Sequence, residues 1–292
     1  METYVHTLPS GLEARYNAAW GDFLLVNSTK LPQTYEYIQT HGPVNLELNS
    51  QWWFAQKDLS FLDGIEHLIE GLDVVANKLD LRGIERLTNL KYLRLSDDLA
   101  QPVAFECFTQ LASCSIVWNK HYRQATFPAS LTDLTLRSYR PRFGFNGDSL
   151  SNLRQVTTLT LIQAAVKDLS LLQHCGALAK LDIAYSRTLT DISAVAQHAS
   201  SLTKLELDTC KKIGDFAPLG QLTQLEWLNL CSCKRIPSVS FVQQLPALKH
   251  FVFYGTVVED GDLSYLKGMP QVAFDNKAHY SLKERDFQYH YS

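Results

Sequence analysis

Short blocks of alternating apolar and polar residues repeat along most of the chain. The clearest two copies lie in residues 202–236, where LTKLELDTCKKI is followed by LEWLNLCSCKRI. Leucines fill the first, fourth and sixth positions of both copies, which begin at Leu202 and Leu225, 23 residues apart. Side chains alternate between the two faces of a strand, so the pattern predicts a short strand whose fourth and sixth residues are buried.

The same block can be followed in both directions from this pair. Its first position falls at Trp20, Pro43, Ile69, Leu90, Leu111, Leu131, Val156, Leu178, Leu202, Leu225, Leu248 and Val272, of which Trp20, Pro43 and Val272 begin incomplete copies. A period of about 23 residues is typical of leucine-rich repeats. We therefore predict an α/β fold, namely a right-handed leucine-rich repeat solenoid. Its parallel sheet would lie on the concave side, with short helices or 3₁₀ turns on the convex side.

The repeats span residues 43–274 without a break that would indicate a domain boundary. We interpret residues 1–42 as an N-terminal cap with a degenerate first repeat, because an open solenoid would expose its core. Apolar residues at helical spacing within 12–23 predict a helix in this cap, ending near Gly21. Residues 275–292 are either a C-terminal cap or a tail.

Two further positions of the repeat carry side chains that suit a turn. The ninth position is expected to bond the backbone where the chain leaves the strand, and it holds Asn119, Cys210 and Cys233. On the return side, an aspartate is expected to accept backbone N–H groups two or three residues on and so to begin a short helix or 3₁₀ turn. The aspartates in this position are Asp58, Asp168, Asp191 and Asp215.

The segments IGDFAPLGQLTQLEWLNL, LTDISAVAQHASSLTKLEL and LRGIERLTNLKYLRL resemble the short repeats of bacterial internalin-type leucine-rich repeat proteins. The resemblance covers roughly residues 43–274 and implies the fold. It implies little about function, because this fold serves binding in many unrelated settings. The chain differs from secreted internalins in lacking a basic and then apolar N-terminal segment and in its many cysteines, so an extracellular adhesion role is not carried over.

Composition excludes several classes of partner. A net charge of −3 gives no basis for binding nucleic acid, which depends on clustered Lys and Arg. No apolar run approaches the roughly 18 residues that a membrane span requires. At least four of the six cysteines fall at core positions of the repeats. We therefore predict buried free thiols in a reducing compartment, and a cytoplasmic protein.

Catalytic and metal-binding motifs were sought and not found. The sequence contains no Gly-rich phosphate loop, H-E-x-x-H, nucleophile elbow or C-x-x-C pair. The nearest candidate is Cys231-Ser232-Cys233, but zinc needs about four convergent ligands and Cys233 already has a ninth-position role. We predict no enzymatic activity, no cofactor and no metal site.

The third, fifth and seventh positions of the strands point away from the core and define a candidate binding face. These positions are small in the middle repeats and combine charged and aromatic residues in the later ones. The predicted partner-binding residues are Lys180, Asp182, Tyr185, Lys204, Glu206, Asp208, Trp227, Asn229, His250 and Tyr254. Lys180 should lie opposite Lys204, and Asp182 opposite Glu206. Aromatics flanked by charge resemble a protein-binding hot spot; the alternative is that these are ordinary solvated positions.

A second candidate is the aromatic insert Asn49-Ser50-Gln51-Trp52-Trp53-Phe54. It lies in the longest repeat, whose start is 26 residues before the next. We favour the interpretation that the three aromatics fold back over the N-terminal core. The alternative is a binding surface.

These expectations together describe a non-enzymatic, cytoplasmic protein-binding scaffold, monomeric when free, that recognises a protein partner through its concave face. One specific hypothesis is an immunity protein that blocks a cognate toxin. The alternative is a secreted effector or adaptor that acts on host proteins. A hydrolase would need converging titratable residues on the concave face, and counting along the repeats brings none together.

Overall fold

A computed structural model describes residues 4–76, 78–96, 101–122, 125–141, 150 and 152–287. The first three residues of the predicted N-terminal cap and residues 288–292 of the C-terminal segment lie outside the described residues. The chain divides into two compact units. Unit 1 comprises Met1–Leu134 and Asp148–Leu153, and unit 2 comprises Thr135–Gly147 and Arg154–Ser292.

Fourteen strands form one sheet in the order β1 to β12, β14 and β16, and two short strands, β13 and β15, form a separate pair. The pairs from β3 to β7 and from β9 to β16 are parallel, whereas β1, β2 and β3 pair antiparallel. Short 3₁₀ helices lie between the parallel strands, and the connection from β3 to β4 also contains the helix α1 (Leu31–His41). This arrangement is the leucine-rich repeat solenoid that the sequence predicts.

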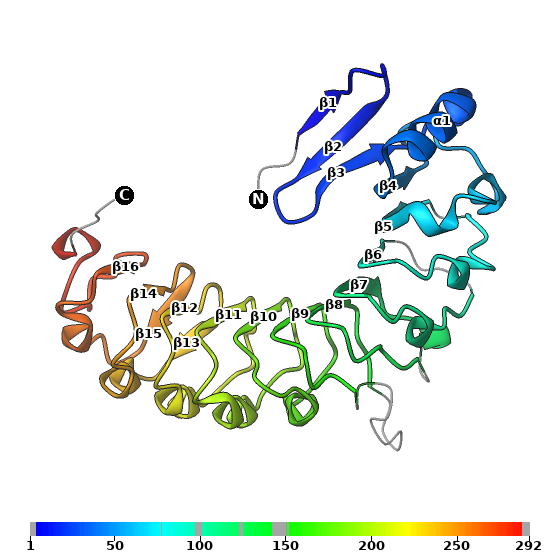
Figure 1. The fold of residues 1–292 in the computed structure, drawn as a ribbon. Coiled ribbons are helices and arrows are strands. Elements are labelled where there is room, and N and C mark those ends of the chain that lie inside the picture. The colour runs from blue at the N-terminus through cyan, green and yellow to red at the C-terminus, as the bar shows by residue number, and fades with distance from the viewer. Residues whose placement is uncertain are drawn as a thin grey trace. The chain divides into compact units, whose positions relative to one another are not determined.

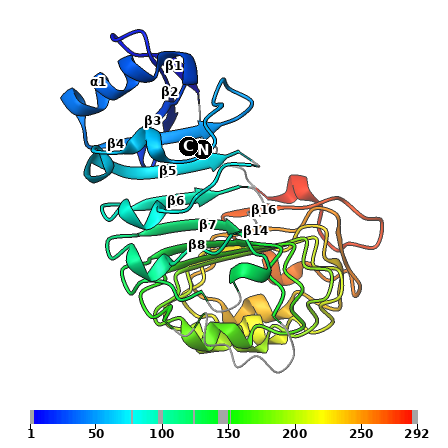
Figure 2. The same cartoon turned by 90° about the vertical axis from the view of Figure 1, so that its right-hand side faces the viewer.

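Unit 1 contains the antiparallel hairpin and the first parallel strands, which Figure 2 shows stacked from β4 onward. Its strands are β1 (Val5–Thr7), β2 (Glu13–Asn17), β3 (Gly21–Leu25), β4 (Val44–Asn49), β5 (Ile69–Val75), β6 (Tyr92–Leu95) and β7 (Ser113–Val117). Its helices are α1 (Leu31–His41) and the 3₁₀ helices Ser28–Lys30, Ser60–Leu62, Glu66–Leu68, Ile84–Arg86, Phe105–Cys107 and Lys120–Tyr122. Strand β8 (Asp133–Arg137) spans the division between the units.

Unit 2 repeats one strand and one 3₁₀ helix, which lie on opposite sides of the unit (Figure 1). Its strands are β9 (Thr158–Ile162), β10 (Lys180–Ala184), β11 (Lys204–Asp208), β12 (Trp227–Asn229), β13 (Lys234–Ile236), β14 (His250–Val252), β15 (Thr256–Val258) and β16 (Gln271–Ala273). Its 3₁₀ helices are Ser170–His174, Ser193–His198, Ala217–Gln221, Ser240–Gln244, Ser264–Leu266 and Glu284–Asp286.

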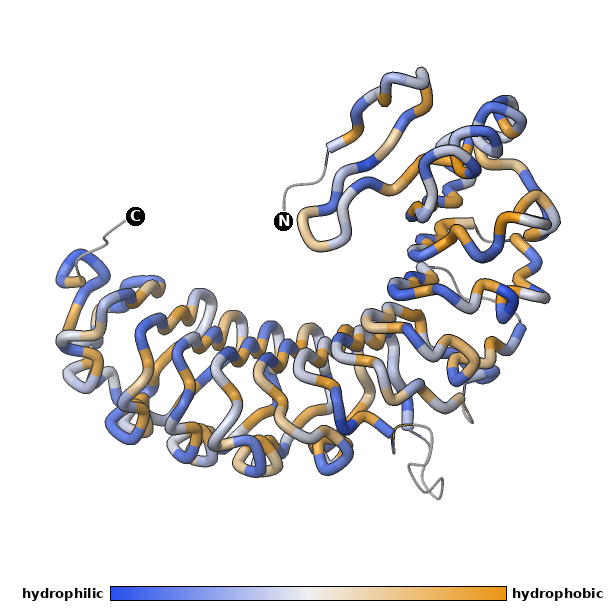
Figure 3. The backbone as a smooth tube through the Cα atoms, in the orientation of Figure 1, coloured by the Kyte–Doolittle hydropathy of each residue, from blue (hydrophilic) through white to orange (hydrophobic). Residues whose placement is uncertain are grey.

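The strand register places equivalent repeat positions opposite one another, and the fourth position is buried throughout unit 2. Apolar and polar positions alternate along these strands (Figure 3). The fourth-position residues in register are Leu159, Leu181, Leu205, Leu228, Phe251 and Val272, none more than 1% exposed. Burial of this column is the main source of stability in each repeat, because apolar surface is removed from water on both sides of every leucine.

Two of the incomplete repeat starts are wrong. Leu24 pairs with Leu46, so the first repeat begins at Gly21 rather than Trp20. The burial of all four residues 23–26 removes the alternation that would have set this register. At the other end, Val272 pairs with Phe251 and therefore occupies a fourth position, not a first one.

The predicted helix within residues 12–23 is also wrong, because β2 and β3 form an antiparallel hairpin there. Leu12 and Ala14 are both buried and lie two residues apart, which is the spacing of a strand. Gly21 follows the turn with a φ of 75°, a conformation that glycine adopts without strain. The helix of this segment is α1, which begins at Leu31, just before Pro32.

The repeats that begin at Leu131, Val156, Leu178, Leu202, Leu225 and Leu248 leave their strands through an eighth-position residue in the left-handed backbone conformation. In unit 2 these residues are Ser138, Gln163, Tyr185, Thr209 and Ser232, with φ between 53° and 58°, and Gly255, with φ of 67°. The turned backbone aims its N–H at the next strand: Tyr185 donates to the Asp208 carbonyl at 2.9 Å, and Thr209 to that of Cys231 at 3.0 Å. The turn therefore joins neighbouring repeats, at a conformational cost that the cross-strand bond offsets.

The ninth position bonds the preceding repeat as predicted for Cys210 and Cys233. Cys210 Sγ lies 3.5 Å from the Ile183 carbonyl, and Cys233 Sγ lies 3.1 Å from that of Leu207. Thr256 takes the same place in the next repeat, where its hydroxyl donates to the Leu230 carbonyl at 2.6 Å. These bonds satisfy strand carbonyls at the edge of the core.

The four return-side aspartates also act as predicted. Each carboxylate accepts the N–H of the residue two positions on, at 2.8 to 3.0 Å, and a 3₁₀ helix begins at that residue. At the C-terminal end, Tyr280 and Phe287 pack against Phe274, with ring centroids 5.8 and 5.9 Å apart. Both side chains are buried, so residues 275–287 cover the last strand.

Shortening a fourth-position leucine should open a cavity in the core. Leu205→Ala and Leu228→Ala, both at positions with 0% exposure, should each lower the free energy of unfolding by about 2–5 kcal/mol. Lys180→Ala, at an exposed position of the same sheet, should change it by less than about 0.5 kcal/mol. Chemical denaturation followed by circular dichroism measures all three, and equal losses would contradict the register described here.

Candidate functional site

Third-position side chains of neighbouring strands in unit 2 form a row, called here the aromatic row. Lys204, Trp227, His250 and Gln271 lie opposite one another on β11, β12, β14 and β16. The Lys204 ammonium lies 5.2 Å from the centre of the Trp227 ring. The Trp227 and His250 rings stack with centroids 4.8 Å apart, and His250 Nδ1 lies 2.6 Å from Gln271 Oε1. Each ring is contacted on both sides, so the row is held in one arrangement.

Charged fifth- and seventh-position side chains lie beside the aromatic row. Asp182 lies opposite Glu206, and Lys180 opposite Lys204, as the sequence predicts. Lys204 Nζ lies 2.7 Å from Glu206 Oε1. Burial raises the pKa of Asp182, and the nearby carboxylates of Glu206 and Asp208 raise it further, against the effect of Lys204. The face therefore contains carboxylates that repel one another.

The remaining predicted residues differ in how far they reach solvent. Tyr185 and Tyr254 are 50% and 42% exposed, and the Tyr254 hydroxyl donates to Glu284 Oε1 at 2.8 Å. Asn229 Oδ1 accepts the backbone N–H of Cys231 at 2.9 Å. The Asn229 side chain is therefore engaged with its own strand end, whereas both tyrosines present ring surface to solvent.

The favoured interpretation of the aromatic insert is wrong for two of its three aromatic residues. Trp52 and Trp53 are 37% and 57% exposed, and only Phe54 is buried. The two indole rings meet edge to face, with centroids 6.3 Å apart. Trp53 has a φ of 69°, and its carbonyl accepts the N–H of Ser28 at 3.1 Å. The turn places Phe54 in the core and directs the tryptophans outward.

A buried charged cluster in unit 1 was missed by the sequence analysis. Arg15 on β2 forms ion pairs with Glu47 on β4 and with Asp73 on β5, the latter at 2.9 Å. Arg94 on β6 adds a second contact to Asp73, at 3.2 Å. Asp73 is fully buried, and its Oδ1 atom has no hydrogen-bond partner among the described residues. Burial raises the pKa of Asp73 to about 6, since it outweighs the opposing effect of Arg94.

Aromatic rings cover this cluster. The Arg15 guanidinium lies 5.2 Å from the centre of the Phe23 ring, and Tyr92 contacts both Phe23 and Trp20 with centroids 5.1 and 5.5 Å apart. Burial raises the pKa of Tyr92 to about 12. The cluster is thus packed within unit 1 and works as a structural element that ties the hairpin to the first repeats.

The sequence did contain a signal for the cluster. Glu47, Asp73 and Arg94 are the fifth-position residues of three consecutive repeats, and the register places them side by side. The candidate face predicted from the sequence comprises outward positions of the later repeats only, so Glu47 and Asp73 fall outside it. Arg15 cannot be found in this way, because the sequence pattern predicts a helix for its segment.

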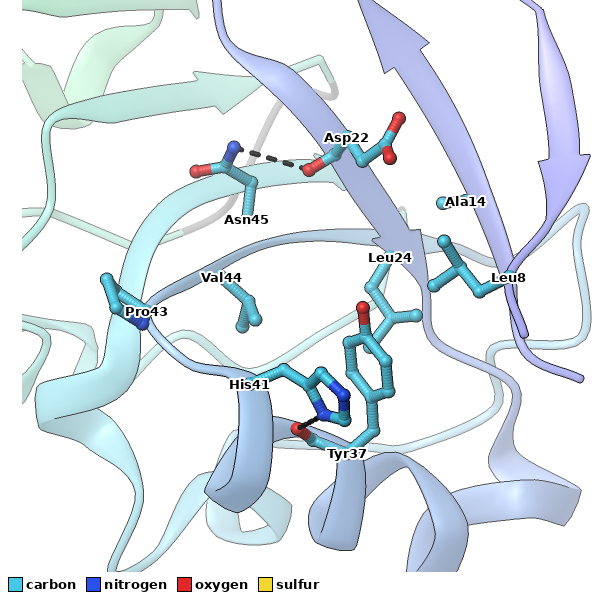
Figure 4. A pocket seen from close by; sticks show the side chains of 9 residues that line it. All are labelled: Leu8, Ala14, Asp22, Leu24, Tyr37, His41, Pro43, Val44 and Asn45. Carbon is cyan, nitrogen blue, oxygen red and sulfur yellow. Dashed lines mark hydrogen bonds between the residues drawn. The ribbon is translucent and has the colours of Figure 1, made fainter. Parts of the chain in front are cut away.

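An open pocket of about 250 Å³ in unit 1 lies between helix α1, the hairpin and strand β4 (Figure 4). The Tyr37 and His41 rings stack there with centroids 4.3 Å apart, and His41 Nδ1 lies 3.2 Å from the Tyr37 carbonyl. Asp22, on the opposite wall, lies 3.3 Å from His6 Nε2. The lining contains no Ser, Thr, Cys or Lys that could act as a nucleophile beside His41.

Four of the six cysteines are buried, as their core positions in the repeats predict. Cys114, Cys175, Cys210 and Cys233 are buried, and all six cysteines are unpaired. Burial raises the pKa of Cys175 and Cys210 to about 11 and that of Cys233 to about 12. Within the described ranges, no three His, Cys, Asp or Glu side chains gather closely enough to hold a metal ion. None of the helices described is long and apolar enough to cross a bilayer.

Comparison with known proteins supports the fold. No family model and no curated protein match the sequence. An internalin (inlF) from Listeria monocytogenes is similar in structure, with a TM-score of 0.52 and 16% sequence identity over 80% of this chain and 76% of the internalin. Internalin C2 from the same organism gives a TM-score of 0.46 and 19% identity over 82% of this chain and 91% of its own. The chain therefore has an internalin-like leucine-rich repeat fold.

Titration of Asp73 should make stability depend on pH. The folded state holds this proton more tightly than the unfolded state, whose ordinary Asp pKa is about 4. The stabilising effect of the protonated form is therefore complete below pH 4 and lost as pH rises through about 6. A shift of about 2 units corresponds to about 3 kcal/mol.

Asp73→Asn removes that titration. The unfolding free energy of wild type minus that of Asp73→Asn should therefore fall by up to about 3 kcal/mol between pH 4 and about pH 6.5. Urea denaturation at each pH measures the difference. A difference that stays constant over this range would show that Asp73 keeps an ordinary pKa.

Proposed function

We propose that this protein is a non-enzymatic protein-binding scaffold that recognises its partner through the sheet face of unit 2. The residues assigned to this face are Lys180, Asp182, Tyr185, Lys204, Glu206, Asp208, Trp227, Asn229, His250 and Tyr254. The observation that carries the proposal is the aromatic row, flanked by carboxylates and by two tyrosines at least 42% exposed. Rings of this kind dominate the binding energy of protein interfaces.

The rigidity of the row favours binding. The Trp227 ring is held between Lys204 and His250, so little side-chain entropy is lost when a partner packs against it. Solenoids commonly bind partners on the open face of their sheet. Burial raises the pKa of Cys231, the cysteine on this face, which disfavours its use as a nucleophile.

The proposal is tested by affinity capture from the source cell, read by mass spectrometry. Wild type is compared with the double variant Trp227→Ala/Tyr254→Ala, whose side chains are only partly buried and whose removal leaves the leucine core intact. The matched control is Trp52→Ala/Trp53→Ala, which also removes two exposed rings but from unit 1. We expect a partner that is retained by wild type and by the control and lost from the Trp227/Tyr254 variant.

Loss from the control alone would move the site to the aromatic insert. A partner retained by all three proteins would contradict the assigned face.

Within this class we keep the immunity-protein hypothesis as the specific proposal, acting in the cytoplasm as a monomer when free. Its support is the combination of a mixed-charge aromatic face with a fold suited to binding. Co-expression with each toxin gene of the same genome tests it, and survival that depends on Trp227 and Tyr254 is the expected result. If every toxin stays toxic on co-expression, the immunity-protein hypothesis fails. The effector or adaptor role is then the alternative, and a translocation assay tests it.

A further inference from the structure

The fifth and seventh positions of unit 2 carry an excess of negative charge. Asp182 lies directly opposite Glu206 on neighbouring strands. Asp208 lies two residues beyond Glu206 and so points to the same side of the sheet. In strands β9 to β16 as described, neither of these positions carries a Lys or Arg. Opposed like charges are destabilising, so this arrangement costs stability in the free protein.

Among the described residues of unit 2, little neutralises this charge. Lys204 Nζ is bound to Glu206 and lies against the Trp227 ring. Neither Asp182 nor Asp208 forms an ion pair within the described residues; Asp208 Oδ1 accepts a hydrogen bond from the neutral Thr209 hydroxyl at 2.7 Å. Negative charge therefore remains unbalanced next to the aromatic row.

The same arrangement occurs in unit 1 and is neutralised there. Glu47 and Asp73 are also fifth-position carboxylates that lie opposite each other on neighbouring strands. Arg15 bridges them, with its guanidinium bonded to both carboxylates and its plane near the Phe23 ring. The protein thus contains one solution to an opposed carboxylate pair at the fifth position: an arginine that binds both carboxylates and packs on an aromatic ring.

We propose that the partner supplies the corresponding arginine in unit 2, from a basic segment that lies on the sheet face. The guanidinium would bind Asp182 and Glu206, with Asp208 beside it, while neighbouring residues of the segment pack on the aromatic row. Arginine suits this place because its planar fork bonds two carboxylates and stacks on rings. This inference rests on the proposed function and specifies the chemistry of the partner.

A pair of synthetic peptides tests the proposal without the natural partner. One peptide alternates arginine with glycine, and the other alternates glutamate with glycine. Binding to the full chain is measured by isothermal titration calorimetry at low ionic strength. We expect the arginine peptide alone to bind, and its Kd to rise about 5- to 10-fold in Asp182→Asn/Asp208→Asn, because this variant removes one of the two carboxylates bound by the guanidinium and the carboxylate beside them.

The control variant is Glu226→Gln/Glu259→Gln. This variant removes two exposed carboxylates of unit 2. Glu226 pairs with Lys249 and Glu259 with Arg235, and neither occupies a fifth or seventh position. We expect its Kd for the arginine peptide to stay within about twofold of wild type. An equal loss in both variants would reduce the binding to general charge attraction, and no binding to wild type would overturn the proposal outright.

The captured partner separates this inference from the proposed function. If capture depends on Trp227 and Tyr254 but not on Asp182 and Asp208, the protein is still a binding scaffold and the arginine proposal fails. If capture depends on neither pair, the sheet face is not the binding site and the proposed function fails with it.

Discussion

Registered stacking of the buried leucines is the constraint on which the rest of unit 2 depends. Because Leu181, Leu205 and Leu228 lie opposite one another, every other position of the repeat is also aligned with its equivalent. The left-handed eighth residue fastens this alignment by sending its N–H to the next strand. The position of a residue within its repeat therefore determines its neighbours on the adjacent strands. Residues at the same position of successive repeats form rows, and these rows make up the surface of the sheet.

The alignment produces both the favourable and the unfavourable contacts of the face. At the third position it stacks Trp227 on His250 and places Lys204 over the indole. At the fifth position it sets Asp182 against Glu206. Since the core fixes the strands, neither contact can be adjusted by sliding one repeat past the next. Unfavourable pairs must be neutralised by another group or remain as a cost.

The strand register and the cross-strand neighbours could be predicted from the sequence wherever leucines occupy the buried positions of the repeat. The prediction failed where that pattern is absent, as at Phe23, which begins a run of four consecutive buried residues, and at Val272. The repeat pattern also could not predict which way the side chains of the aromatic insert point. The turn at Trp53 depends on a hydrogen bond from Ser28, which is distant in sequence. The Arg15 cluster was missed because Arg15 lies on the antiparallel hairpin, outside the repeats. The hairpin places its guanidinium beside the fifth-position residues Glu47 and Asp73.

The two opposed carboxylate pairs show how a repeat protein can separate stability from function. In unit 1, Arg15 comes from the chain itself, so Glu47 and Asp73 are neutralised on folding and Asp73 is buried. In unit 2 no described arginine reaches Asp182, and the pair stays partly open to solvent. A carboxylate that is already neutralised in the free protein contributes little binding free energy when a partner arrives. A carboxylate left unpaired can be neutralised by the partner, and this contributes binding free energy only in the complex. If the proposed function holds, the unbalanced carboxylates serve recognition of the partner and do not stabilise the fold.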